Sequence, residues 1–190
     1  MSVTSQDSYP NSVVFNPTGT KVYMVGDTTN TVYQYTLSTA WDISTGSYAS
    51  KSLDVSAQET APRDIAFKPD GTTAYIVGNT YDYISQYTLS VAWDISTGTY
   101  ASKRMSVTSQ ETYPRSISFS PDGTKVYALG SATNTIYQYD VGSTAATAVT
   151  LPTITGTVST PAIGDLVTYT FETSDSGTTN RLIDEEIITP

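Results

Sequence analysis

The stretch "YQYTLSTAWDIST", from Tyr33 to Thr45, returns almost unchanged as "SQYTLSVAWDIST" at 85–97. A third copy begins as "YQYDVGSTAATA" at Tyr137, and it contains neither the Trp nor the "DIST" of the first two copies. Self-similarity at a fixed spacing indicates one supersecondary unit that stacks on its neighbours. The chain therefore reads as a repeat protein whose third copy departs from the pattern after Asp140.

The repeat has a period of 52 residues, and its copies are rich in Val, Ile, Thr, Tyr and Phe. These residue types favour strands, whereas helical repeats are mostly shorter and rich in Ala, Leu, Glu and Lys. Four short strands per copy are typical of a β-propeller blade, whose repeats span about 40–50 residues. The landmark residues of the repeat, which we expect to be structural, are Phe15, Phe67, Phe119, Gly19, Gly71, Gly123, Trp41 and Trp93.

Each copy reads as four strands in succession. Residues 12–17 alternate, the "PTGT" or "PDGT" that follows is a tight turn, and residues 21–26 are apolar on both faces. A strand that is apolar on both faces has to be covered on both, and a blade between two other blades satisfies that requirement. A third strand around Tyr35 and a polar outer strand at 47–55 complete the copy.

The predicted fold class is all-β. Three four-stranded blades (about 1–53, 54–105 and 106–142) form a partial propeller, and a short β-rich tail follows. Residues 143–152 are small and polar and read as a linker. Residues 153–190 read either as the start of an Ig-like domain or as a docking segment, since an Ig-like domain needs about 100 residues.

Composition narrows the function classes. The chain has 190 residues, a net charge of −9 and a pI near 4.2, which disfavours a nucleic-acid partner because phosphate contacts need basic residues. Histidine and cysteine are absent, so the commonest general base and the usual metal ligand are missing, and we expect no metal and no cofactor. The start "MSVTSQDSYP" is not a secretory signal, and no apolar run of about 18 residues predicts membrane insertion.

The segment "FSPDGTKVYALG" at 119–130 resembles the first hairpin of YVTN-type, lactonase-like and WD-repeat β-propellers. The whole copy, with "YQYTLSTAWDIST", is similar to tandem propeller repeats of phage structural proteins and bacterial surface proteins. The resemblance covers residues 1–142 and implies a propeller fold. Propellers host many unrelated activities, so the resemblance implies the fold more strongly than the function.

The tryptophans of the repeated loop have two interpretations. Trp41 and Trp93 either offer a stacking platform for a sugar ring or close their loops against the space between blades. We expect the second, because Trp is usually largely buried. Asp42 and Asp94 are expected to accept N–H groups of their own turns, and the "PDG" turns offer too few oxygens for calcium.

Aromatic and cationic residues that break the repeat are the candidate binding residues. Tyr9 and Tyr113 precede the first strand where the middle copy has Ala61, and Arg63 and Arg115 follow the next proline. An Arg beside a Tyr at a strand end is typical of a contact hot spot, although a plain solvated loop is the alternative. The candidate binding residues are Tyr9, Arg63, Tyr81, Tyr83, Tyr113 and Arg115.

The function expected from these observations is a non-enzymatic structural or binding module, with no catalytic residues. The resemblance favours a phage virion appendage (a decoration, fibre or tail-associated protein) that contacts proteins or glycans and is assembled in the host cytoplasm. One alternative is a fragment of a bacterial surface adhesin, located outside the cell. A second alternative is a lactonase-like hydrolase propeller, which would need acidic metal ligands in its central channel.

The partner expected for the chain follows from the number of blades. Propellers close with about four to eight blades, so three copies leave an apolar face at each end. We expect a homodimer that closes a six-bladed ring, or contact with other virion subunits. The residues expected on these end faces are Val22, Met24 and Val32 at one end and Tyr127, Leu129, Tyr139 and Val141 at the other.

Overall fold

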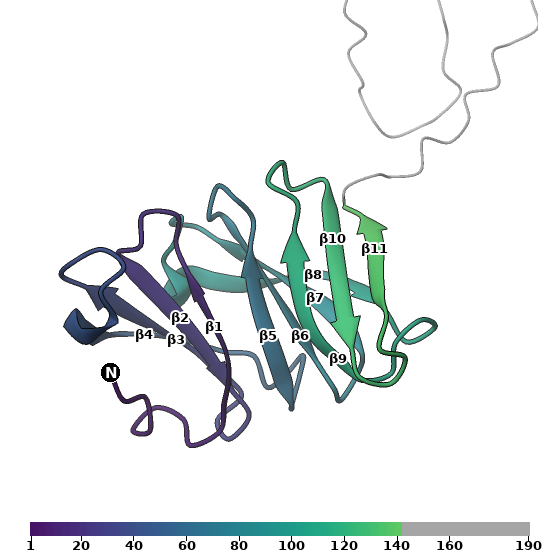
Figure 1. Cartoon of the computed structure of the whole chain (residues 1–190), viewed down its shortest axis with the longest axis horizontal. Coiled ribbons are helices and arrows are strands. Elements are labelled where there is room, and N and C mark those ends of the chain that lie inside the picture. The colour runs from purple at the N-terminus through teal and green to yellow at the C-terminus, as the bar shows by residue number, and fades with distance from the viewer. Residues whose placement is uncertain (142–190) are drawn as a thin grey trace, which may run out of the picture. The chain divides into compact units, whose positions relative to one another are not determined.

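The computed structural model describes residues 1–141, and the predicted linker and tail lie outside these residues. The chain forms three antiparallel sheets, one for each copy of the repeat, and we call them blades 1 to 3 (Figure 1). This arrangement confirms the prediction of an all-β partial propeller.

The strands follow the order of the sequence within each blade. Blade 1 contains β1 (Pro10–Phe15), β2 (Lys21–Gly26), β3 (Thr31–Leu37) and β4 (Gly46–Asp54). Blade 2 contains β5 (Pro62–Phe67), β6 (Thr73–Gly78), β7 (Tyr83–Leu89) and β8 (Gly98–Ser106). Blade 3 contains β9 (Pro114–Phe119), β10 (Lys125–Gly130) and β11 (Ile136–Asp140), and the position of a fourth strand lies outside the described residues.

The turn after the first strand of each blade depends on glycine. Gly19 and Gly71 have φ angles of 68° and 71°, in the left-handed region that glycine enters without strain. A Cβ at either position would also overlap the indole ring of Trp41 or Trp93, which packs against the turn. The prediction of a tight hairpin turn at these glycines is therefore confirmed, and the tryptophan adds a second reason for glycine.

The loop between the third and fourth strands is ordered by its own carboxylate. Asp42 accepts a hydrogen bond from the Ser44 N–H at 3.0 Å, and Asp94 accepts one from Ser96 at 3.2 Å. These carboxylates cap short helices, as expected for turn carboxylates of this kind. The sequence did not predict the two 3-10 helices themselves, η1 (Ile43–Thr45) and η2 (Ile95–Thr97).

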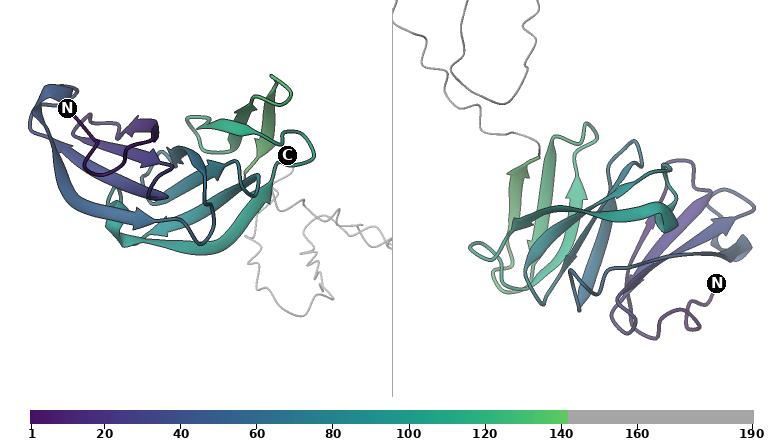
Figure 2. Two further views of the ribbon diagram at one scale, coloured as in Figure 1. Left: turned by 90° about the horizontal axis from the view of Figure 1, so that it is seen from below. Right: turned by 180° about the vertical axis from the view of Figure 1, so that it is seen from behind.

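The blades stack through apolar faces. The innermost strand of blade 2, β5, contacts both β1 and β9, and Figures 1 and 2 show the three sheets side by side. We call the side of a blade that faces the preceding copy its leading face, and the opposite side its trailing face. The trailing face of blade 1, which includes Tyr23, Val25 and Val32, packs on Ile65 and Phe67 of the leading face of blade 2.

The outer faces of the blade stack differ from the expectation. Val22 and Met24 do belong to the leading face of blade 1, but they are 0% and 3% exposed and pack with Val3. Val32 is wrong as an end residue, because it is buried against blade 2. Tyr139 is also wrong as an end residue, because it is half-buried and packs on the cluster between blades 2 and 3.

At the other end, Val141 also packs toward blade 2 rather than outward. Leu129, by contrast, is exposed as predicted. Within residues 1–141, no helix is long and apolar enough to cross a membrane.

Candidate functional site at the rim of the blades

A buried carboxylate holds the backbone in place at the rim of each blade, where the first strand begins. We call this carboxylate and its hydrogen bonds a clasp. Asp7 is 2% exposed and accepts hydrogen bonds from the N–H groups of Tyr9 at 2.7 Å and Thr29 at 2.9 Å. These bonds join the segment before β1 to the loop between β2 and β3. A Cβ on Gly26 would overlap the Asp7 carboxyl, which explains why glycine ends β2.

Glu59 and Glu111 repeat this clasp in the next two blades. Glu59 accepts from the N–H of Ala61 at 2.8 Å, and Glu111 accepts from those of Tyr113 at 2.8 Å and Ala132 at 3.0 Å. Burial raises the pKa values of Asp7 and Glu111, but their hydrogen bonds outweigh it and hold both below the usual range. Sequence reasoning missed the three acids, although their 52-residue spacing was a usable signal.

The clasps present three of the predicted tyrosines to solvent. Tyr9, Tyr81 and Tyr113 are 70%, 47% and 53% exposed. In each case a clasp carboxylate accepts the tyrosine's own N–H, although the Tyr81 contact is long at 3.4 Å. Exposed aromatic side chains on a fixed backbone suit contact with the apolar face of a ligand.

Arg63 lies on the innermost strand of blade 2, two residues after Ala61, the counterpart of Tyr9 and Tyr113. Its Nη1 pairs with the Asp27 carboxylate at 2.9 Å and donates to Asn11 at 3.3 Å, both in blade 1. With the Asn79 amide oriented so that its nitrogen donates to the Pro114 carbonyl, Arg63 Nε donates to the Asn79 side-chain oxygen at 3.0 Å. Within residues 1–141, no hydrogen bond uses Nη2, so two N–H donors of a half-buried guanidinium stay available.

The other two predicted residues, Arg115 and Tyr83, lie in different parts of the blades. Arg115 occupies the same column in blade 3, is exposed, and donates from Nε to Ser131 at 3.3 Å. Tyr83 lies apart from the rim column, on β7, where the Arg104 guanidinium sits 4.2 Å above its ring. The structure therefore groups Arg63 and Arg115 with the exposed tyrosines and leaves Tyr83 on the outer half of the sheet.

Asp64 joins the three inner strands. One carboxylate oxygen accepts from the Ser12 hydroxyl and the Ile65 N–H, and the other accepts from Ser116 Oγ and the Ile117 N–H, both at 2.8 Å. Its acceptor positions are thus used by the protein. Within residues 1–141, no group of three or more His, Cys, Asp or Glu side chains could hold a metal ion. The acidic channel ligands that a metal-dependent propeller needs are not supplied by this part of the chain.

Blade 2 docks on blade 1 through the repeated loop. Tyr23 donates its hydroxyl to the Trp93 carbonyl at 2.6 Å, and Ile95 donates its N–H to the Gln34 side chain at 3.0 Å. Lys51 forms an ion pair with Asp94. Tyr23, Gln34 and Lys51 of blade 1 therefore hold the loop of blade 2, and we call these three residues the loop socket.

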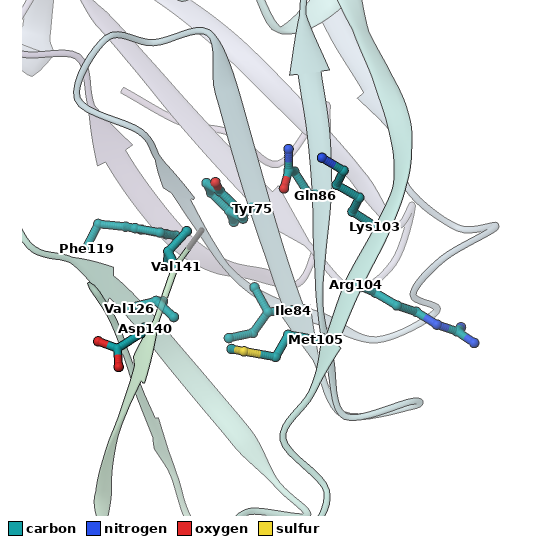
Figure 3. A pocket seen from close by; sticks show the side chains of 10 residues that line it. All are labelled: Tyr75, Ile84, Gln86, Lys103, Arg104, Met105, Phe119, Val126, Asp140 and Val141. Carbon is teal, nitrogen blue, oxygen red and sulfur yellow. The ribbon is translucent and has the colours of Figure 1, made fainter. Parts of the chain in front are cut away.

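The corresponding socket of blade 2 lines a cavity of about 180 Å³ next to blade 3. Figure 3 shows Tyr75, Gln86 and Lys103 around it, the counterparts of Tyr23, Gln34 and Lys51. The third copy has Ala145, Ala146 and Thr147 at the positions of the Trp, Asp and Ile that fill the first socket. The departure of the third copy from the repeat therefore coincides with a cavity at its junction.

Comparison with known proteins identifies the fold family. The family model "Lactonase, 7-bladed beta-propeller" matches residues 3–160. No curated protein sequence matches the chain.

Solved structures agree on the fold. A putative 6-phosphogluconolactonase from Bacteroides fragilis is 18% identical with a TM-score of 0.53, covering 69% of this chain and 34% of its own. A second putative 6-phosphogluconolactonase, from Bacteroides uniformis, is 17% identical with a TM-score of 0.54, covering 72% of this chain and 38% of its own. The chain thus spans little more than a third of these structures.

These findings correct the expected function. The non-enzymatic reading, and with it the phage virion and adhesion assignments, is wrong, because the family match points to a lactonase-like hydrolase propeller. That class was the second alternative drawn from the sequence. The expectation failed because near-identical copies without histidine seemed unsuited to catalysis, whereas some rim positions do differ between copies, such as Asp27, which is replaced by Asn79 and Ser131 in the other two.

Proposed function

The chain belongs to the family of seven-bladed β-propeller lactonases, and we propose that it supplies three blades and a cationic rim to a propeller that hydrolyses sugar-acid lactones. The observation that carries the proposal is the position of Arg63. Its free N–H donors lie at the inner-strand rim, where its partner Asp27 donates its N–H to the carbonyl of the exposed Tyr9, within a fold whose family is named for this reaction.

The rim groups fit the chemistry of lactone opening. Water attacks the ring carbonyl carbon, the ring C–O bond breaks, and the products are a carboxylate and a hydroxyl group. The Arg63 guanidinium is suited to stabilise the oxyanion that develops on the carbonyl oxygen. Asp27, paired with Arg63, is suited to accept the proton of the attacking water and return it to the departing alkoxide.

Substrate recognition would use the neighbouring groups of the rim. The apolar faces of Tyr9 and Tyr113 can pack on a sugar ring. Arg115 offers a second guanidinium in the same column, and arginine binds carboxylate and phosphate groups with well-defined geometry. Two of the similar structures are described as putative 6-phosphogluconolactonases, so a phosphorylated sugar lactone is the substrate class we favour.

The test is the hydrolysis of 6-phosphogluconolactone and of gluconolactone by the 190-residue chain, with the release of protons as the measured signal. We expect turnover above the buffer rate, and Arg63→Gln should reduce kcat/KM at least tenfold. Lys103→Gln is the matched control, because it removes a cation from the outer strand of blade 2. Hydrolysis at the buffer rate, or equal loss in both variants, would contradict the proposal.

A further inference from the structure

The trailing face of blade 3 repeats a surface that is buried elsewhere in the molecule. Leu129 and Ile136 are 42% and 68% exposed, whereas their counterparts in blade 1, Val25 and Val32, are each 0% exposed. The two pairs lie opposite each other across neighbouring strands in the same register. Blade 3 thus carries the apolar part of a blade junction with no blade among the described residues to cover it.

The polar part of the junction is repeated as well. Tyr127 and Gln138 occupy the positions of Tyr23 and Gln34, which bind the backbone of the docked loop in the junction of blades 1 and 2. Gln138 is exposed, whereas Gln34 is 2% exposed. A phenol donor and an amide acceptor are therefore in place for another Trp-Asp-Ile loop.

Such a loop is free at the opposite end of the molecule. Trp41 and Ile43 are 60% and 41% exposed, whereas Ile95, the counterpart of Ile43, is 0% exposed. Val13 on β1 is 59% exposed, and its counterpart Ile65 is 2% exposed. The leading face of blade 1 thus offers the loop and the apolar strand residues that a trailing face receives.

The N-terminal residues supply the last matching element. The N–H of Val55 donates to the Asn30 carbonyl at 2.9 Å, which ties the end of an outer strand to the turn before β3. Val3 stands at the repeat position of Val55, and Asn134 shares the left-handed backbone of Asn30. Residues 1–3 therefore fit the turn before β11, which is where an outer strand of blade 3 would end.

We propose that the trailing face of blade 3 binds the leading face of blade 1 of a second copy of this chain, head to tail. In this contact the partner's loop at 41–43 lies over Tyr127 and Gln138, and Leu129 and Ile136 pack on the partner's β1. The proposal is independent of lactone hydrolysis, because it rests on the match between one occupied junction and two exposed faces.

A second copy is the occupant we assign to this face for a specific reason. The trailing face is built for a Trp-Asp-Ile loop, and the described part of the chain has one such loop undocked.

The test is the mass of the full chain by sedimentation over a hundredfold range of concentration. We expect association that grows with concentration in the wild type. Ile43→Asp and Ile136→Asp, one at each end, should each abolish it. Val91→Asp is the matched control, since Val91 is 55% exposed in the docked loop of blade 2, and it should associate like the wild type.

Mixing the two end variants separates head-to-tail contact from other modes. Each variant keeps the end that the other has lost, so the mixture should form pairs that neither forms alone. A wild type that remains a monomer throughout would overturn the proposal. Association that survives either end variant, or no pairs in the mixture, would also overturn it, provided that circular dichroism shows both variants folded.

Discussion

The loops at 39–45 and 91–97 have nearly the same sequence and different surroundings. Trp93 is half-buried between Phe67 and Tyr23, at centroid distances of 5.2 and 6.4 Å. Among the described residues, Trp41 stacks on Phe15 alone and is 60% exposed. The difference lies in the preceding copy, which gives the second loop a socket. The sequence of such a loop encodes half of a junction, and its neighbour encodes the other half.

The internal geometry of the loops is the same despite this difference. Trp41 and Trp93 have φ angles of 65° and 61°, and Asp42 and Asp94 bind the equivalent serine N–H. The loop is therefore shaped by its own turn and then docked. Stability measurements on matched pairs of variants can isolate the docking contribution, because the local contribution is common to both loops.

The largest difference is expected for the isoleucine pair. Ile95→Ala should lower the free energy of unfolding by about 3 kcal/mol, the usual cost of truncating a fully buried isoleucine. Ile43→Ala should lower it by about 0.5 kcal/mol, since Ile43 is 41% exposed. Urea denaturation at low protein concentration measures both, and equal losses would break the comparison.

The tryptophan pair should show a smaller difference. Truncating a buried Trp usually costs about 3–5 kcal/mol, which is what the sequence alone suggests for both loops. The structure lowers this to about 2 kcal/mol for Trp93→Ala, because the ring is half-buried, and to about 1 kcal/mol for Trp41→Ala. A loss of about 4 kcal/mol for Trp41→Ala would show that its ring is covered in solution.

The ion pair of the docked loop gives a pH-dependent difference. Burial raises the pKa of Asp94, but hydrogen bonds from Lys51 and Ser96 outweigh it and hold that pKa below the usual value. The pair therefore stabilises the fold at neutral pH and loses this effect as the pH falls through the folded-state pKa. Lys51→Ala should cost about 0.5–1 kcal/mol at pH 7, and this cost should shrink as the pH falls below the unfolded-state pKa of Asp94 and through its lower folded-state pKa.

The fourth comparison concerns the turns before the third strands. Asn30, oriented to donate to the carbonyls of Asp27 and Thr60, satisfies its turn, whereas the Oδ1 of Asp82 is buried without a hydrogen-bond partner among residues 1–141. Burial, with the charges of Glu59 and Glu111, raises the pKa of Asp82. A carboxyl group whose pKa is higher in the folded state than in the unfolded chain lowers the stability of the fold most at neutral pH. This cost disappears as the pH falls below the pKa of the group in the unfolded chain.

Asp82→Asn should therefore stabilise the chain by about 0.5–1 kcal/mol at pH 7. The gain should shrink toward pH 4, where Asp82 takes up a proton. Thermal melting at the two pH values measures the change. A constant gain across this range would mean that the amide, and not the loss of the charge, is responsible.

The fold could be predicted from the sequence because the repeat presents the same structural signals three times. The glycine turns, the alternating strands and the turns capped by Asp42 and Asp94 follow from local residue chemistry. The rim was harder, because the clasp acids Asp7, Glu59 and Glu111 act across a gap of about 20 residues to the next loop, and their partners are backbone N–H groups that no side-chain pattern reveals. The bridging role of Asp64 was also hidden, since it depends on serines in two other copies.

The direction of the docking contacts has a consequence for how such a chain can change length. The Lys51–Asp94 and Gln34–Ile95 contacts join blade 1 to blade 2, with the socket in the earlier copy and the loop in the later one. The second copy carries both a loop that fits the socket before it and a socket of its own, so an in-frame duplication of this 52-residue unit would leave matching halves at the new joint. Unequal recombination could therefore add a blade in one step, without a compensating substitution.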